Sequence, residues 1–150
     1  MSTLPKLMNK SDVMLRKMRK VNNTEIPYAL KQYMGSTKSD TRYIYEYLYI
    51  LICYLKNTLA VCHRHQAAIK QFTEPAVVSG YQNGIDKLGD VFGDLTNKIN
   101  KISSDIDKII PVLVYDSDVL DRMQECLAII VITYNKLNEL IHDINYTQNV

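Results

Sequence analysis

The chain of 150 residues has the length of one ordinary domain, and its apolar (47%) and charged (23%) fractions are close to globular averages. These values exclude intrinsic disorder and a fibrous repeat. The formal net charge of +2 is unevenly distributed, because residues 1–40 hold 8 Lys and Arg against 3 Asp and Glu, and the rest hold 10 against 13. An anionic partner would therefore meet the N-terminal part of the chain.

The N-terminus predicts a basic amphipathic helix over residues 4–21. At about 100° per residue, its Leu and Met side chains and Val21 share one side of the helix, and only Val13 and Asp12 break this partition. The opposite side carries the candidate residues for binding an anionic partner: Lys6, Lys10, Arg16, Lys17, Arg19 and Lys20. Such a partner is an acidic protein face, nucleic acid phosphates or an anionic membrane surface. The alternative is that the apolar side packs on the rest of the protein and the cations are only solvated.

A second short helix is predicted after this one. Asn23 or Thr24 would cap it, Pro27 would lie in its first turn and Gly35 would end it. The sequence is therefore divided into a basic N-terminal helix over residues 1–22 and a helical bundle over residues 23–150, which together form a single domain.

A long helix is predicted from Thr41 to Phe72, a stretch without Gly or Pro that ends before Pro75. Its first half is apolar nearly all round, which is typical of a helix in the middle of a bundle. Tyr residues at every second position leave a β-strand as the alternative over residues 43–50. A transmembrane span is not expected, because charged residues interrupt the apolar run well short of about 20 residues.

Two heptad seams predict an antiparallel, coiled-coil-like hairpin over residues 84–110 and 117–145, and this is the strongest pattern in the sequence. Pro111 prevents the first helix from continuing, and Asp116 or Ser117 would cap the second. The seams are Ile85, Leu88, Phe92, Leu95, Ile99, Ile102, Ile106, Ile109 and Leu120, Met123, Leu127, Ile130, Tyr134, Leu137, Ile141, Ile144. The apolar tip of the hairpin, a candidate protein interface, consists of Val112, Leu113, Val114 and Tyr115.

No catalytic or metal-binding motif is apparent. His63 and His65 point about 200° apart on a helix, so they are not expected to share a metal. Three carboxylates four residues apart, Asp86, Asp90 and Asp94, form an acidic ridge that could receive the basic helix or be solvated. Three cysteines cannot all pair within one chain, and we expect buried free thiols.

We therefore expect an all-α bundle of three long helices, including the hairpin, plus two short N-terminal helices. No cofactor or catalytic residue is predicted. The expected function is that of a non-enzymatic interaction or structural protein, a homo-oligomer or part of a larger assembly. Its composition is of the kind found in AT-rich genomes, viral ones included. The alternatives are a small nucleic-acid-binding subunit and a membrane-active regulator in peripheral contact with lipid. Lacking an apolar leader, the chain is expected to be cytoplasmic.

Overall fold

The structure is a computed structural model of the chain. It describes residues 3–26, 28, 41–109 and 117–149, with the backbone alone for residues 41–48, 109, 117 and 120.

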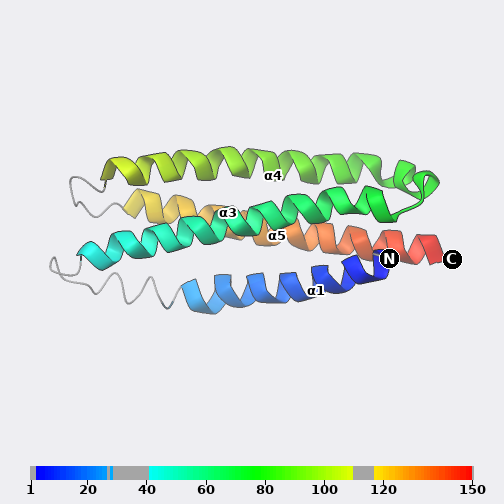
Figure 1. Ribbon diagram of the computed structural model, residues 1–150, viewed down its shortest axis with the longest axis horizontal. Coiled ribbons are helices and arrows are strands. Elements are labelled where there is room, and N and C mark those ends of the chain that lie inside the picture. The colour runs from blue at the N-terminus through cyan, green and yellow to red at the C-terminus, as the bar shows by residue number, and fades with distance from the viewer. Residues whose placement is uncertain (1–2, 27, 29–40, 110–116, 150) are drawn as a thin grey trace.

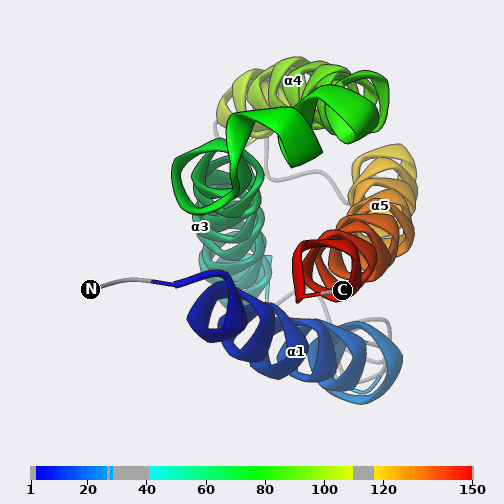
Figure 2. The ribbon, with the colours of Figure 1, turned by 90° about the vertical axis from the view of Figure 1, so that its right-hand side faces the viewer.

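Four helices lie side by side and alternate in direction (Figure 1): α1 (Leu4–Lys20), α3 (Thr41–Phe72), α4 (Pro75–Ile109) and α5 (Ser117–Asn149). Seen end-on, they form a ring in the order α1, α3, α4 and α5, so that α1 and α4 lie on opposite sides (Figure 2). The elements of the described residues are all helical, which confirms the predicted class and the three long helices. The N-terminal helix is a fourth member of the bundle.

The hairpin of α4 and α5 is confirmed. Every seam residue whose side chain is described is buried, from Ile85 to Ile106 and from Met123 to Ile144. Helix α4 begins earlier than predicted, at Pro75, where a proline is tolerated because the first turn needs no amide donor. Val78 is buried and lies seven residues before Ile85, so the seam contains one more heptad than the sequence analysis recognised.

Residues 43–50 belong to α3, so the β-strand alternative is wrong. The described side chains in the first half of α3 do not all lie in the middle of the bundle as predicted, since Ile50 is 64% exposed and Tyr49 40% exposed. In a ring of four helices each helix keeps a face toward water, whatever its composition. For the same reason Cys53 is exposed, contrary to expectation, whereas Cys62 and Cys126 are buried as predicted.

No separately capped helix starts at Asn23 or Thr24. The chain instead continues from α1 into a wider turn, η1 (Val21–Glu25), with backbone angles at Val21 that are those of a right-handed helix. A turn of this kind inserts one residue into the helix. Ile26 thus lies eight positions after Met18, where a regular heptad would have seven, and both residues are buried. Pro27 and Gly35 lie outside the described residues.

Helix α1 is docked on the bundle. Its buried residues are Leu4, Leu7, Ser11, Leu15 and Met18, and it packs mainly against α5 and only lightly against α3. The acidic ridge on α4 is not its partner, because α4 lies across the ring from α1 (Figure 2). Asp86 of that ridge pairs with Lys70 of α3 instead. Three sides of the ring are therefore closed by helix packing, and the side between α1 and α3 is loosely packed.

Candidate functional site

A buried polar contact holds α1 against α5. Ser11 is the middle one of the five buried residues of α1, and the other four are apolar. It is fully buried and contacts Asn138 of α5. The Asn138 side chain donates one hydrogen bond to Ser11 Oγ (3.0 Å) and another to Asp12 Oδ1 (2.8 Å). His142, one turn further along α5, lies 2.8 Å from the same carboxylate oxygen. The hydrogen bonds from Asn138 and His142 hold the pKa of Asp12 below its usual range.

This contact fixes the rotation and register of α1. A buried polar pair within an apolar seam is satisfied in one register only, because any slip leaves both groups without partners. Toward the C-terminal end of α1, Arg19 donates a hydrogen bond to Asn135 Oδ1 of α5 (2.7 Å). Because α1 is fixed against α5, its remaining faces are held in a defined position relative to α3.

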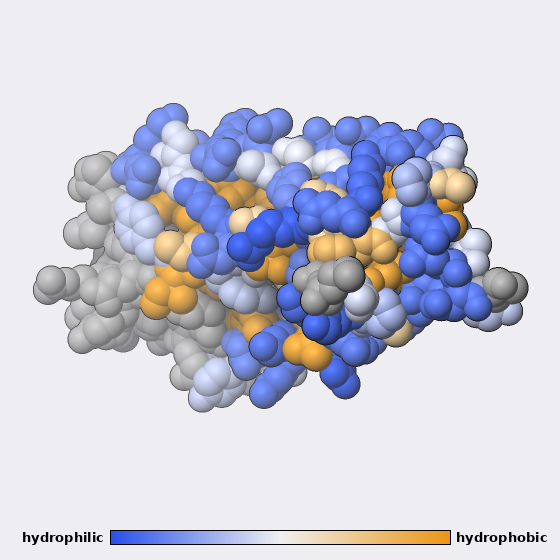
Figure 3. Space-filling model, turned by 45° about the vertical axis from the view of Figure 1, so that its right-hand side comes forward, coloured by the Kyte–Doolittle hydropathy of each residue, from blue (hydrophilic) through white to orange (hydrophobic). Residues whose placement is uncertain are grey.

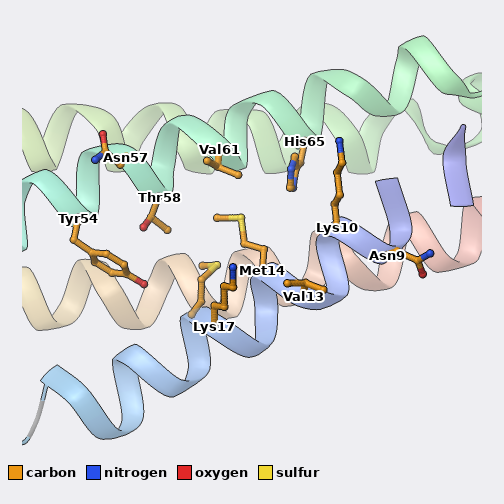
Figure 4. Close-up of a pocket in the computed structure, with 11 residues that line it drawn as sticks. Asn9, Lys10, Val13, Met14, Lys17, Tyr54, Asn57, Thr58, Val61 and His65 are labelled. Atoms are coloured by element: carbon orange, nitrogen blue, oxygen red, sulfur yellow. The ribbon is translucent and has the colours of Figure 1, made fainter. Parts of the chain in front are cut away.

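Between α1 and α3 lies a groove of about 620 Å³, referred to below as the α1–α3 groove. Its apolar part is formed by Val13, Met14 and Met18 of α1 and by Tyr54 and Val61 of α3. Figure 4 shows Tyr54 pointing toward α1, and Met14 pointing toward α3. The polar residues that complete the lining are Asn9, Lys10, Lys17, Asn57, Thr58 and His65.

The groove is apolar yet open to water. Val13 is 42% exposed, and Met14, Tyr54 and Val61 are only partly buried. Ile50 lies four residues before Tyr54 on α3, so the exposed apolar stripe continues beyond the groove. On the face that carries α3, apolar surface shows between the hydrophilic side chains along the molecule (Figure 3). Exposed apolar surface that is contiguous and bordered by charge commonly marks a binding site.

A second hollow of about 520 Å³ continues from the groove toward the N-terminal end of α1. The two share Lys10 and His65, and the second is bordered also by Lys6 and Arg64. Among the described residues, no carboxylate lines either hollow. Asp12, the acidic residue of α1, accepts a hydrogen bond from Asn138 of α5. Burial, and to a smaller extent the nearby charge of Glu25, raises the pKa of Tyr54. The two hollows between α1 and α3 are therefore lined by apolar side chains and bordered by Lys and Arg side chains.

The structure separates the six predicted basic residues. All are exposed, but only three of them, Lys6, Lys10 and Lys17, line the two hollows. Arg19 is turned toward α5. Arg16 and Lys20 are exposed and line neither hollow. The other predicted interface, Val112 to Tyr115 at the hairpin tip, lies outside the described residues.

The histidine and cysteine side chains next to the groove make structural contacts. His65 Nδ1 lies 2.6 Å from the buried hydroxyl of Tyr134 on α5, and His63 Nε2 lies 3.2 Å from Thr96 Oγ1 on α4, so the two rings diverge as expected. Burial, followed by the charges of Lys10 and Arg64, lowers the pKa of His65. Burial raises the pKa of Cys62 to about 12, which keeps its thiol protonated.

Two further observations limit the chemistry of the described residues. No three side chains of His, Cys, Asp and Glu among them form a group that could hold a metal ion. None of the helices in the described part of the chain is long and apolar enough to cross a membrane.

The α3 wall of the groove was not predicted. The sequence predicts the helix that carries Tyr54, Val61, Arg64 and His65, but it does not predict a binding surface there. One signal was available, since no Asp or Glu occurs between Glu46 and Glu74, a stretch that covers nearly all of α3. A long helical stretch without carboxylates but with exposed cations carries a net positive charge.

No protein-family model, curated protein or solved structure matches the chain.

Proposed function

We propose that this protein is a non-enzymatic interaction protein, and that the α1–α3 groove is the surface on which it binds another protein chain. The observation that carries the proposal is the open fourth side of the bundle. Apolar side chains there, Val13 and Tyr54 among them, face water in a concave strip bordered by cations. Burying such a strip against a partner is favourable by roughly 25 cal/mol per Å² of apolar surface.

The rest of the bundle is suited to hold this groove in shape. The α4–α5 seam is fully buried along its described length, and the contact of Ser11 and Asp12 with Asn138 fixes α1 on α5. A preformed groove binds with a smaller loss of conformational entropy than a surface that must first be ordered.

The side chains near the groove support a non-catalytic role. His65 is committed to Tyr134, Asp12 to Asn138 and His142, and Cys62 is buried with a raised pKa. A nucleophile or general base needs both access and a pKa near the working pH, and these groups are held in contacts that stabilise the fold instead. Buried free thiols further support a reducing, cytoplasmic location.

Photo-cross-linking tests the proposal. Benzoylphenylalanine is placed at Val61 in the groove or, as a matched control, at Asn97, which is exposed on α4. In cells that produce the protein, we expect a discrete cross-linked product, with a second copy or with another chain, from position 61 and not from position 97. Val13→Glu, which puts a charge into the groove, should abolish that product. Equal products from both positions, or none from position 61, would refute the proposal.

A second candidate function is nucleic acid binding, which is favoured by the exposure of six cations on α1. Each phosphate contact releases counterions, so binding should weaken steeply with added salt. It should also be lost when Lys6, Lys10, Arg16, Lys17, Arg19 and Lys20 are all reversed in charge. A gel-shift titration with duplex and single-stranded oligonucleotides at several salt concentrations decides this. Affinity that is independent of salt, or unaffected by the charge reversal, would exclude it.

A further inference from the structure

We propose that the occupant of the α1–α3 groove is an acidic amphipathic helix of the partner chain. This inference rests on the function proposed above, and it adds the chemistry by which the partner is recognised. Three features carry it: the length of the groove, the position of its cations and the nature of its walls.

The length of the groove suits about three turns of helix. Its lining runs from Asn9 to Met18 on α1 and from Tyr54 to His65 on α3. At 1.5 Å per residue these stretches are about 14 and 17 Å long, and three turns of an α-helix are about 16 Å. A helix that docks in a groove inserts apolar residues at positions i, i+3 or i+4, and i+7. The flexible Met14 and Met18 can adapt to such side chains.

The charges of the groove select an acidic helix. Lys10 and Lys17 lie seven residues apart on α1, which is two turns, and both line the groove. Arg64 and Lys6 add positive charge where the groove meets the second hollow. Carboxylates spaced by seven residues beside an apolar stripe would face Lys10 and Lys17 together. A basic helix would be repelled, because the Lys and Arg side chains that line the two hollows are all positively charged.

The walls of the groove favour a helix over other occupants. Both walls are helices whose backbone groups are paired internally, so there is no strand edge on which an extended peptide could add. An acyl chain needs enclosure on most sides, whereas here Val13 and Asn57 remain exposed. An amphipathic helix buries one face and keeps the other in water, which matches an open groove.

A second copy of this chain does not supply such a helix from its acidic ridge. Asp86, Asp90 and Asp94 are spaced four residues apart on α4. The apolar side of α4 is already buried in its own bundle, as Leu88, Phe92 and Leu95 show. The ridge has charge but no free apolar stripe to fill the groove. The acidic ridge is therefore not the helix that we expect to occupy the groove.

The test uses the full chain and three synthetic peptides of about 18 residues, long enough to sustain a helix in water. All three peptides carry Leu at positions i, i+4, i+7 and i+11. The residues beside this apolar stripe are Glu in the first peptide, Gln in the second and Lys in the third. Binding is measured by fluorescence anisotropy of labelled peptide. We expect the Glu peptide to bind, the Gln peptide to bind at least about tenfold more weakly, and the Lys peptide not to bind.

Two variants separate charge from shape. Lys10→Glu with Lys17→Glu should reverse the preference, so that the Lys peptide binds and the Glu peptide does not. The matched control is Lys101→Glu with Lys108→Glu, two exposed lysines on α4 with the same spacing of seven residues, which should leave the preference unchanged. Val13→Arg adds a cation but fills the groove, and it should abolish binding of the Glu peptide. Circular dichroism confirms that each variant is folded.

The outcomes distinguish this inference from the proposed function. If position 61 cross-links to a partner in cells but the Glu peptide binds no better than the Gln or Lys peptide, the partner class is wrong and the docking function stands. Duplex DNA and vesicles of anionic phospholipid are titrated under the same conditions. The acidic-helix inference is overturned if the Glu peptide does not bind while the DNA or the vesicles do, and if Lys10→Glu with Lys17→Glu abolishes that binding. If position 61 fails to cross-link as well, the docking function falls with it.

Discussion

The hydrogen bonds of Asn138 allow the attachment of α1 to be tested quantitatively. Asn138→Ala removes the bond to the buried hydroxyl of Ser11 and the bond to the carboxylate of Asp12. A bond between neutral groups contributes about 0.5–1.5 kcal/mol, and one to a charged group about 1.5–3 kcal/mol. The Asp12 side chain is 38% exposed, which places its bond at or below the low end of that range. We expect the free energy of unfolding to fall by about 2 kcal/mol.

Thermal unfolding followed by circular dichroism measures this loss. For a chain of this length, each kcal/mol lowers Tm by about 2–4 °C, so Asn138→Ala should lower it by about 4–8 °C. The matched control is Asn135→Ala, one turn away on the same helix, which breaks only exposed hydrogen bonds to Arg19 and Glu139. That change should stay within about 0.5 kcal/mol.

Hydrogen exchange shows where the loss is felt. Because Asn138 joins α1 to the bundle, its replacement should reduce amide protection in α1 more than in α4, whose seam does not involve it. If Asn138→Ala lowers Tm no more than Asn135→Ala does, or if protection falls equally in α1 and α4, Asn138 does not fix α1 on the bundle.

Three further predictions concern the interior of the bundle. Tyr134→Phe removes the hydroxyl that lies 2.6 Å from His65 Nδ1, and urea unfolding should show a loss of about 1 kcal/mol. Because folding lowers the pKa of His65, the unfolded chain binds more protons below the ordinary value of 6.5. The contribution of His65 to the free energy of unfolding should thus be complete above about pH 6.5 and should decline as the pH falls toward its folded pKa. Urea titrations at several pH values measure this dependence, and His65→Gln should remove it. A thiol-reactive reagent should label Cys53 rapidly in the folded protein, and Cys62 and Cys126 only in denaturant. Rapid labelling of more than one thiol, or of any thiol in Cys53→Ser, would contradict the burial described here.

Much of the fold could be predicted because its signals are local. The alternation of three and four residues in α4 and α5 identifies which side of each helix is buried, and the described seam residues from Ile85 to Ile144 are buried accordingly. The earlier start of α4 at Pro75 was missed because its first turns carry few large apolar residues. The continuation of α1 through Val21–Glu25 was missed because an inserted residue disrupts the regular spacing on which such a prediction depends.

The candidate site was only half predictable. The cations of α1 are apparent in the sequence because Lys and Arg residues recur along this one helix. The opposite wall is not, since Tyr54, Val61 and Arg64 become part of a surface only where α1 fails to close on α3. A partly exposed apolar residue and a core residue have the same sequence signature on a helix.

The sequence by itself determined that the chain forms helices, and which stripe of α1, α4 and α5 is apolar, because helix formation and amphipathicity depend on residues three and four positions apart. Tertiary structure alone decided the order of the helices around the ring and the contact of Ser11 with Asn138, 127 positions away. It also decided which side of the ring stays open. These features depend on how large surfaces fit together, and an apolar stripe specifies that it will be buried without specifying its partner.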